Sequence, residues 1–226
     1  MVTTSGFDRA TLTQTLHQGS LSLGLALEQD TLDALVDYLA LLSKWNAVYN
    51  LTAVRDPHQM VTQHLLDSLA AVPAFSSAHN VLDVGAGGGL PGMVLAIWAR
   101  QARPTMRVTL VDTVHKKTAF LTQAKVELGL GNVNVYTKRV EKLQVPVLFD
   151  VITSRAFAEL ADFIDWSGHL LAEEGQFIAM KGVLPQEEIA RLPVGWQVRN
   201  VHPLQVPGMD AERHLIFIQR SAVVPH

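Results

Sequence analysis

The sequence contains no cysteine, and this absence removes several classes of function at once. Disulfide scaffolds, zinc–thiolate sites and iron–sulfur clusters all need the thiol side chain. Enzymes that attack their substrate with a cysteine thiolate are excluded for the same reason. The nine histidines are scattered without the spacing of a metal site, so we predict no metal.

The sequence also has little charge and no long apolar run. Charged residues make up 17% and hydrophobic residues 48% of the 226 positions, which predicts a globular chain with one sizeable core. No stretch approaches the roughly 20 consecutive apolar residues of a membrane span. The first ten residues lack the pattern of a secretory signal. We therefore expect a cytoplasmic protein without membrane contact.

Basic side chains are concentrated in one part of the chain, although the net charge is −3. Residues 100–145 carry nine basic and three acidic side chains, whereas the segments on either side are acidic. The basic residues either face a polyanion or lie on ordinary solvated helix surfaces, and charge alone favours the second interpretation. They are Arg100, Arg103, Arg107, Lys116, Lys117, Lys125, Lys138, Arg139 and Lys142.

Hydrophobic spacing divides the chain into two regions. Residues 11–46 repeat apolar side chains at helical spacing, which predicts about two helices, one of them capped by Asp30 or Thr31. From residue 80 onward, short runs of Val, Ile and Leu alternate with glycines and helical stretches, as in a parallel sheet covered by helices. Strands are predicted at 81–84, 107–111, 133–136, 151–154, 176–180, 197–201 and 215–219, and helices near 92–100, 116–128, 138–143 and 160–171.

The last two strands are joined by residues 202–214, which have no helical period, so we expect an antiparallel pair at one edge. This order of elements resembles the seven-stranded, Rossmann-like α/β fold of methyltransferases, with a mostly parallel sheet and one antiparallel edge strand. We divide the chain into an N-terminal helical extension, residues 1–79, that packs on the main domain, and a methyltransferase domain, residues 80–226.

A glycine-rich loop follows the first predicted strand, in the segment 81–92. Gly85, Gly87 and Gly89 allow the backbone to turn sharply and to approach a ligand closely. Pro91 suits the first turn of a helix, whose free amides are expected to face that ligand. A loop of this kind is shared by proteins that bind NAD, FAD or S-adenosylmethionine.

Three details favour S-adenosylmethionine. Leu90 stands where the dinucleotide fingerprint needs its third glycine. Asp83 lies inside the strand, where methyltransferases commonly carry an acid. About 80 residues precede the loop, whereas dinucleotide domains often begin with that strand. A P-loop nucleotidase is disfavoured because the sequence has no G-x-x-x-x-G-K-[ST] segment.

The ends of the next two strands carry acids that suit a nucleoside. Asp112, at the tip of the second strand, is placed to accept hydrogen bonds from ribose hydroxyls, and this role is favoured over that of a helix cap. After the third strand, Val140 and Glu141 either bracket an adenine edge or form an ordinary helix start with a favourable acid. Spacing alone does not decide between these two readings.

The fourth strand ends without the Asn- or Asp-Pro-Pro-Tyr motif of enzymes that methylate exocyclic base amines. Arg155 stands there instead, at the sheet edge where ligands bind in open α/β folds. Its guanidinium is suited to hold a carboxylate or phosphate, or to stack on a base. We prefer this to a solvated arginine because Ser154, Ala156 and Phe157 are expected to be buried.

Several segments together resemble the bacterial small-subunit (16S) ribosomal RNA guanine-N7 methyltransferases, the glucose-inhibited division protein B family. The similarity runs from about residue 32 to residue 220. The segments that carry it are Lys44-Trp45-Asn46, Tyr49-Asn50-Leu51-Thr52, Arg55-Asp56-Pro57, His64-Leu65-Leu66-Asp67-Ser68, Gly89-Leu90-Pro91-Gly92, Ser154-Arg155-Ala156-Phe157, Met180-Lys181-Gly182 and Glu212-Arg213-His214-Leu215. The loop departs modestly from its relatives, which often carry Thr at the position of Ala86.

The resemblance implies S-adenosyl-L-methionine as cofactor and 16S ribosomal RNA, or the 30S subunit or its precursor, as partner. It implies a cofactor site made of Gly85, Ala86, Gly87, Gly89, Leu90, Asp112, Val140, Glu141 and Arg155, with Arg155 also near the methyl-transfer point. It places the RNA at Arg55, His64, Ser68, Lys181 and Arg213. His64 and Asp67 are equally interpreted as a packing pair on one helix, and the structural role is preferred for that pair.

The chemistry agrees with the resemblance. Guanine N7 has an in-plane lone pair and no proton at neutral pH, so its methylation needs alignment and no general base. Alternatives remain: a methyltransferase for a small molecule or protein, a non-catalytic RNA-binding assembly factor that keeps a cofactor pocket, and a dehydrogenase. We expect a monomer.

Overall fold

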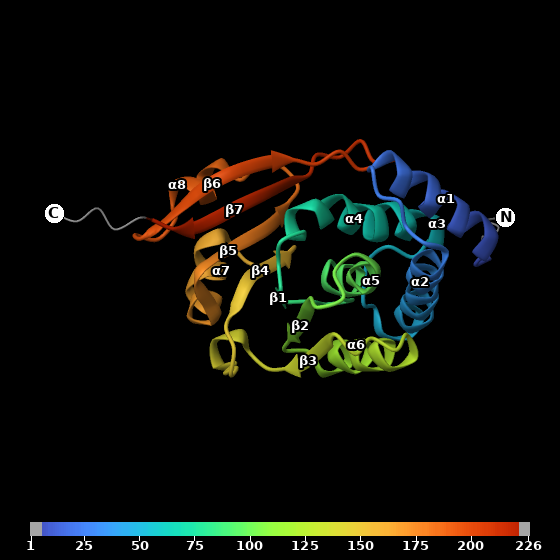
Figure 1. Cartoon of the computed structure of the whole chain (residues 1–226), viewed down its shortest axis with the longest axis horizontal. Helices are drawn as coiled ribbons and strands as arrows, with labels where there is room; N and C mark the ends of the chain where they lie inside the picture. The colour runs from blue at the N-terminus through green and yellow to red at the C-terminus, as the bar shows by residue number, and fades with distance from the viewer. Residues whose placement is uncertain (1–5, 222–226) are drawn as a thin grey trace.

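The computed structural model describes residues 6–221 and contains one seven-stranded sheet with helices on both faces (Figure 1). All seven predicted strands are present, each somewhat longer than predicted, because residues beyond the apolar runs continue the pairing. The strands are β1 (Asn80–Val84), β2 (Arg107–Asp112), β3 (Val133–Thr137), β4 (Phe149–Arg155), β5 (Leu171–Lys181), β6 (Trp196–Pro203) and β7 (His214–Arg220).

The strand order is β3-β2-β1-β4-β5-β7-β6, and the first five strands of the chain pair in parallel. β7 runs antiparallel to both β5 and β6. The predicted fold class and the antiparallel pair at one edge are therefore confirmed. The antiparallel strand β7 itself lies one place in from the edge, and β6 is outermost. The chain reverses its winding direction at β1 and β4, so their carboxyl ends form the crevice where such folds bind ligands.

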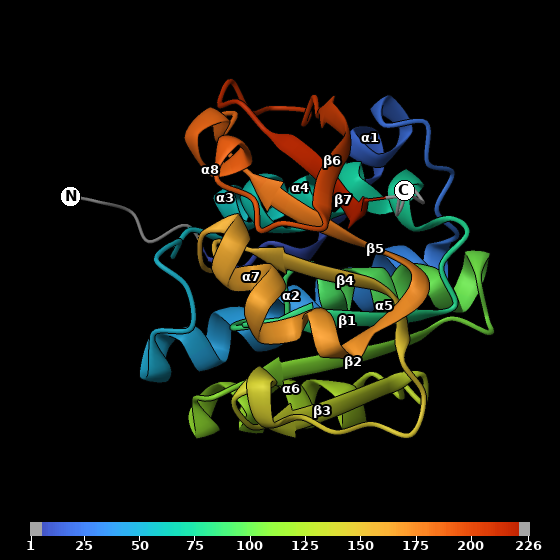
Figure 2. The same cartoon turned by 90° about the vertical axis from the view of Figure 1, so that its left-hand side faces the viewer.

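Successive side chains of the parallel strands enter two different apolar cores. On β1, Val81 belongs to the core under one set of helices and Leu82 to the core on the other face. On the first face lie α4 (Asp67–Ala71), α5 (Gly92–Ala102) and α6 (His115–Glu127), and on the second lie α7 (Leu160–Ser167) and α8 (Gln186–Ala190), as Figures 1 and 2 show.

The N-terminal helices share the larger core with α5 and α6. They are α1 (Arg9–Ser22), α2 (Gln29–Tyr49) and α3 (Pro57–Met60), followed by a π-helical segment, η1 (Val61–Leu66), and after α4 by a 3₁₀ turn, η2 (Val72–Phe75). Leu35, Leu39 and Leu42 of α2 are fully buried in that core. Whether the chain divides into two units at residue 80 stays a prediction, and residues 1–5 and 222–226 of those units lie outside the described part.

Two local predictions were wrong. α2 is not capped by Asp30 or Thr31: it begins at Gln29, with Glu28 at the cap position, because the Glu28 carbonyl already accepts from the amides of Thr31 and Leu32. The helix predicted at 138–143 is only a three-residue 3₁₀ turn, η3 (Val140–Lys142), because Arg139 and Leu143 on either side of it have extended backbone. The other three predicted helices are present as α5, α6 and α7, the last ending in a 3₁₀ turn, η4 (Gly168–Leu170).

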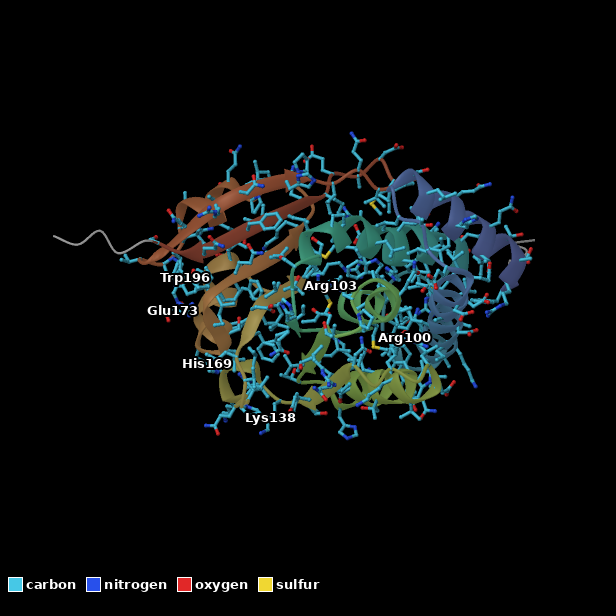
Figure 3. The ribbon with its side chains drawn as sticks, viewed as in Figure 1. Arg100, Arg103, Lys138, His169, Glu173 and Trp196 are labelled. Carbon is cyan, nitrogen blue, oxygen red and sulfur yellow. The ribbon has the colours of Figure 1, made fainter. Side chains whose placement is uncertain are left out.

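The basic residues of 100–145 do not form one surface. Arg100, Arg103 and Arg107 precede or begin β2, at the amino end of the sheet, whereas Lys138 follows β3 at its carboxyl end. Figure 3 shows Arg100 and Arg103 beside α5, well apart from Lys138. The two ends of a strand lie apart by the length of the strand. Basic residues that are close in sequence but flank a strand therefore lie at opposite ends of the sheet.

Candidate functional site

A cavity of about 410 Å³ opens at the carboxyl ends of β1, β2, β3 and β4. The lining comes from the last residues of β1 and β2 and from residues that follow the four strands. Figure 2 shows the arrowheads of β2 and β4 pointing toward this same edge. The lining residues include Gly85, Asp112, Lys117, Val140, Glu141, Ala156, Phe157 and Trp166. The predicted nucleoside-binding residues from three separate strands are thus brought to one cavity.

The glycine loop has the backbone conformation that its sequence requires. Gly85, Gly87 and Gly89 all have positive φ angles, of 66°, 56° and 91°. The amides of Gly85 and Ala86 donate to the Val111 carbonyl on β2. Of the predicted loop residues, Gly85 lines the cavity, whereas Ala86 and Leu90 are buried behind it. The loop therefore presents mainly backbone to the cavity.

The helix start after the loop is not free, contrary to expectation. The amide of Gly92, the first residue of α5, donates to Oδ2 of Asp83 at 2.8 Å. Burial raises the pKa of Asp83 to about 7, although this amide and the charge of Arg155 act in the opposite direction. Asp83 Oδ1 is buried without a hydrogen-bond partner. This acid therefore fixes α5 against β1 from inside the sheet, and it occupies the amide that a ligand was expected to use.

Helix α2 holds the same loop from the other side. The hydroxyl of Tyr38, which is fully buried, donates to the carbonyl of Gly88. Leu42 lies so close to Gly88 that a side chain there would meet it at 3.2 Å. The N-terminal helices thus position the loop directly, a role that sequence spacing did not reveal because the contact joins residues 50 positions apart.

Asp112 organises the cavity floor. Its Oδ2 accepts from the Gly87 amide at 3.0 Å and its Oδ1 accepts from the Val114 amide at 2.8 Å. Lys117 Nζ lies 3.7 Å from Oδ2. The carboxylate therefore ties the glycine loop to Val114, the residue at the cap position of α6, and its contact with a ribose stays a prediction. Each oxygen keeps a further lone pair for a hydroxyl in the cavity.

Two aromatic rings stand at the mouth of the cavity. Phe157 and Trp166 contact edge to face, with ring centroids 5.7 Å apart, and both are more than one-third exposed. The Phe157 ring lies over Gly85, where a side chain on the glycine would come within 2.5 Å of it. Phe157 and Ala156 are not buried as we expected, because Ala156 adopts a left-handed backbone, φ 51°, that turns the chain outward.

A second cavity, of about 380 Å³, lies beside the first, and Ala156 lines both. Three basic side chains border it: Arg155, Lys181 and Arg213. Arg155 Nη1 donates to Asp67 Oδ2 at 2.9 Å, and Arg213 Nε donates to Asp67 Oδ1 at 2.8 Å. The Asp67 side chain is almost completely buried, whereas the arginines are 22% and 28% exposed. One buried carboxylate therefore joins two guanidinium groups at the cavity wall.

His64 lines the second cavity as an uncharged group. Its Nε2 is hydrogen bonded to Thr52 Oγ1 at 2.9 Å, and its Nδ1 is buried without a partner. Burial, with the positive charge of Arg155, lowers the pKa of His64 to about 4. The predicted packing pair of His64 with Asp67 is not a hydrogen-bonded one, since His64 Nε2 bonds to Thr52 and its Nδ1 has no partner.

The remaining predicted RNA-binding residues differ in position. Lys181 borders the second cavity, but its ammonium donates to Glu188 Oε2 at 2.7 Å and to the Ala158 carbonyl. Arg55 lies outside both cavities and donates to Asn50 Oδ1. Ser68 is fully buried, and its hydroxyl has no partner among the described residues. The structure thus gathers His64, Lys181 and Arg213 around Arg155 but leaves the other two apart.

Sequence reasoning missed three residues that shape the site. Gln63 lines the second cavity and offers its carbonyl to Arg155 Nη1 at 3.0 Å. Glu188 accepts from Lys181 and from the Leu160 amide, which ties α8 to α7. Asp67 was assigned to packing. Its position within the His64–Ser68 segment was a usable signal, but nothing in the sequence shows which arginines it meets 88 and 146 residues away.

The first cavity fits the nucleoside part of S-adenosylmethionine. The Asp112 carboxylate has free lone pairs there. Val111 and Val140 form apolar walls, and the two aromatic rings stand at the mouth. A ribose diol needs such an acceptor, and a flat adenine ring needs such walls.

No helix of the described residues is long and apolar enough to cross a membrane.

Comparison with known proteins agrees with this geometry. The family model for rRNA small subunit methyltransferase G matches residues 31–216. A ribosomal RNA small subunit methyltransferase G from Herminiimonas arsenicoxydans is 69% identical over 95% of this chain and 99% of its own. One from Janthinobacterium sp. (strain Marseille) is 67% identical over 96% and 99%. The structure of the N-methyltransferase NodS from Bradyrhizobium japonicum WM9 with S-adenosyl-L-homocysteine shares the fold, with TM-score 0.52, 14% identity and coverage of 79% and 98%.

Proposed function

The chain belongs to the rRNA small subunit methyltransferase G family, and from this premise we propose that it methylates N7 of a guanine in 16S ribosomal RNA with S-adenosyl-L-methionine. The observation that carries the proposal is the pair of adjoining cavities at the carboxyl ends of the strands. One presents an acid and apolar walls, the other presents arginines, and Ala156 is common to both. A donor and an acceptor bound in them lie side by side.

The first cavity supplies the cofactor contacts. S-adenosylmethionine, when bound, provides an electrophilic methyl group on a sulfonium sulfur. Asp112 accepts from the ribose hydroxyls, and Val140 and Glu141 flank the adenine. The glycine loop, held by Asp112, Tyr38 and Asp83, leaves room for the methionine part next to Gly85.

The residues of the second cavity need to position a base. They have no proton to remove from its N7. Guanine N7 attacks with its own lone pair, so alignment supplies much of the rate. Arg155 lines the second cavity, next in sequence to Ala156, which lines both cavities, and it orients the base edge. His64, with its pKa near 4, stays neutral and adds no positive charge where the methylated ring becomes cationic.

The RNA must present its target as an accessible base. N7 lies in the deep major groove of an RNA helix, so the target guanine is in a loop or is splayed out of the helix. Arg213 and Lys181 border the entry, and the substrate is 16S RNA within the 30S subunit or its precursor. This substrate places the protein in the cytoplasm, where it acts as a monomer.

Transfer of a labelled methyl group tests the proposal directly. Purified protein, labelled S-adenosylmethionine and 30S subunits from a strain lacking the gene are incubated, and the RNA is digested to nucleosides. We expect label in 7-methylguanosine with the wild type and a loss of about 100-fold in rate with Arg155→Ala, because the base loses its alignment. Label in another nucleoside, or only in protein, would contradict the proposal.

A further inference from the structure

A third cavity, of about 540 Å³, adjoins the second one. It lies between the α3–η1 segment and the connection between β6 and β7, and it shares Gln63 and Arg213 with the second cavity. The first and second cavities are joined in the same way by Ala156. The three cavities therefore form a series that starts at the cofactor cavity, and the proposed reaction leaves the third one unused.

The connection between β6 and β7 has a hydrogen-bonded shape beside the third cavity. The Leu204 amide donates to the Arg213 carbonyl at 2.7 Å, which closes the two ends of the connection. The Met209 amide donates to the Val206 carbonyl at 3.0 Å, in a turn that contains Gly208 with a φ angle of 77°. The connection extends from the β6–β7 pair toward α1 (Figure 1). This segment, which has no helical period in the sequence, thus forms one wall of the cavity.

The side chains of the third cavity are suited to the edge of a base. Gln59 and Gln63 each carry an amide with donors and an acceptor, and neither side-chain amide has a hydrogen-bond partner among the described residues. The carboxylate of Asp210 belongs to the wall formed by the connection. Such groups bind the exposed base edges of single-stranded RNA, whereas a carboxylate repels a phosphate. The cavity therefore favours a base over the RNA backbone.

Arg213 lies at the boundary between the second and third cavities. Its Nε donates to Asp67 Oδ1 and its Nη1 to the Glu212 carbonyl, both at 2.8 Å, so two contacts hold the guanidinium group. Its Nη2 has no acceptor among the described residues, and the side chain is 28% exposed. An RNA strand with one base in each of these cavities has its linking phosphate between them. The free Nη2 is suited to donate to that phosphate.

We propose that the third cavity binds the base of a nucleotide next to the target guanine, and that Gln59 and Gln63 form hydrogen bonds with the edge of that base. This inference rests on the proposed function, because the target guanine in the second cavity defines which base is its neighbour. Arg213 contacts the phosphate between the two nucleotides. The third cavity thereby determines specificity, since a guanine with the wrong neighbour is bound less well.

Changing the neighbouring base tests the proposal. Once the methylated guanosine is mapped, 30S subunits are prepared from strains that lack the gene and carry each other base at the position before or after this guanosine. We expect kcat/KM of the wild-type protein to fall by about 10-fold or more when one of these two neighbours is changed, because hydrogen bonds to a base edge discriminate by such factors. Unchanged kcat/KM at both positions would overturn the proposal.

The variants Gln59→Ala and Gln63→Ala test whether the third cavity causes this preference. Both side chains are exposed, and Gln63→Ala keeps the backbone carbonyl that accepts from Arg155. Each variant should be about 10-fold slower on natural subunits and lose little more when the neighbouring base is changed. Because variant and wild type are compared on the same subunits, distortion of the RNA by the base change cancels. A full base preference in both variants, or a loss of equal size on every kind of subunit, would overturn the proposal.

Gln14→Ala is the matched control. Gln14 is also an exposed glutamine in a helix, but it lies on α1 and lines none of the three cavities. This variant should keep both the rate and the base preference of the wild type.

Arg213→Ala separates the phosphate contact from the base contact. Loss of a phosphate contact should lower kcat/KM by a similar factor on every kind of subunit and leave the base preference unchanged. A base preference that disappears in this variant would overturn the assignment of the base to the two glutamines. Wild-type protein that transfers no methyl group to any 30S subunit would instead overturn the proposed function.

Discussion

Asp112 shows how one side chain serves both the fold and the site. Its two oxygens hold the glycine loop and the start of α6, and the same carboxylate borders the cofactor cavity. The Lys117 ammonium lies close enough to form an ion pair with this carboxylate. A substitution here therefore affects ligand contacts and loop position together, and the two effects have to be separated by experiment.

Replacing Asp112 by alanine should weaken the binding of S-adenosylhomocysteine by about 1 to 3 kcal/mol, as hydrogen bonds to a charged acceptor are lost. Calorimetry at constant ionic strength measures this directly. Asp150→Ala, a carboxylate at the opposite end of the sheet, serves as control and should leave the affinity unchanged. Unchanged affinity in the Asp112 variant would refute its contact with the ribose.

His64 should make the protein sensitive to acid. Its pKa is near 6.5 in the unfolded chain and about 4 in the folded one, so the unfolded form binds more protons between these values. The contribution of His64 to the free energy of unfolding therefore falls as pH drops from 6.5 to 4, by up to about 3 kcal/mol. Urea unfolding of His64→Gln across this range should show a smaller loss than the wild type.

Asp83 acts with the opposite sign in the same range. Its raised pKa means that the folded form keeps a proton up to about pH 7 which the unfolded form has lost, so its contribution to stability declines as pH rises. The two residues partly cancel in the wild type. The difference between wild type and H64Q isolates the histidine, and an identical pH dependence of the two proteins would contradict its buried, neutral state.

At the scale of elements, α5 approaches the sheet so closely that only glycine fits at its start. A β-carbon on Gly92 would overlap Leu110 on β2 and lie 2.7 Å from Asp83 Oδ2 on β1. The Asp83 hydrogen bond to the Gly92 amide depends on this approach. The packing of α5 and the conformation of the loop before it are therefore coupled.

Gly92→Ala should lower the free energy of unfolding by about 1 to 3 kcal/mol, the usual cost of overpacking, despite alanine's better helix propensity. Gly131→Ala is the matched control, because a β-carbon there meets no atom within 4 Å, and it should be close to neutral. Urea denaturation of both variants measures the difference. Equal stability of the two would show that α5 is free to shift away from the strands.

The sheet was predictable because its signals are local. Runs of β-branched residues separated by helical stretches indicate each strand of a parallel sheet, and the glycines with positive φ are identified by their residue type. The start of α2 and the helix at 138–143 were mispredicted because apolar spacing does not show at which residue the backbone changes from extended to helical. Asp112, Val140 and Glu141 line one cavity, since Asp112 ends β2 and the other two come shortly after β3.

The second cavity was much less predictable than the first. Its wall joins η1, β4, β5 and the segment before β7, and the pairing of Asp67 with Arg155 and Arg213 depends on how these elements meet in space. Ala156 and Phe157 were expected to be buried at the end of β4, but both are exposed. The left-handed backbone of Ala156 turns the chain outward there, and the residue type alanine does not predict this conformation.

At the scale of the whole molecule, the basic side chains of residues 100–145 are distributed over the two ends of the sheet. The basic segment is divided between them, so no large basic surface favours nonspecific attraction to RNA, and the proposed function assigns recognition to the few cations around the second cavity. Such a protein gains little affinity from phosphates in general. It is suited to one accessible guanine in a folded particle, where shape supplies the remaining selectivity.

The most direct measurement is mass spectrometry of 16S ribosomal RNA from cells with and without the gene. The account predicts that one 7-methylguanosine present in the parent strain is missing from the deletion strain. It further predicts that the wild-type gene restores this nucleoside and that the Arg155→Ala gene does not. A deletion strain whose 16S RNA keeps every 7-methylguanosine would contradict the assignment.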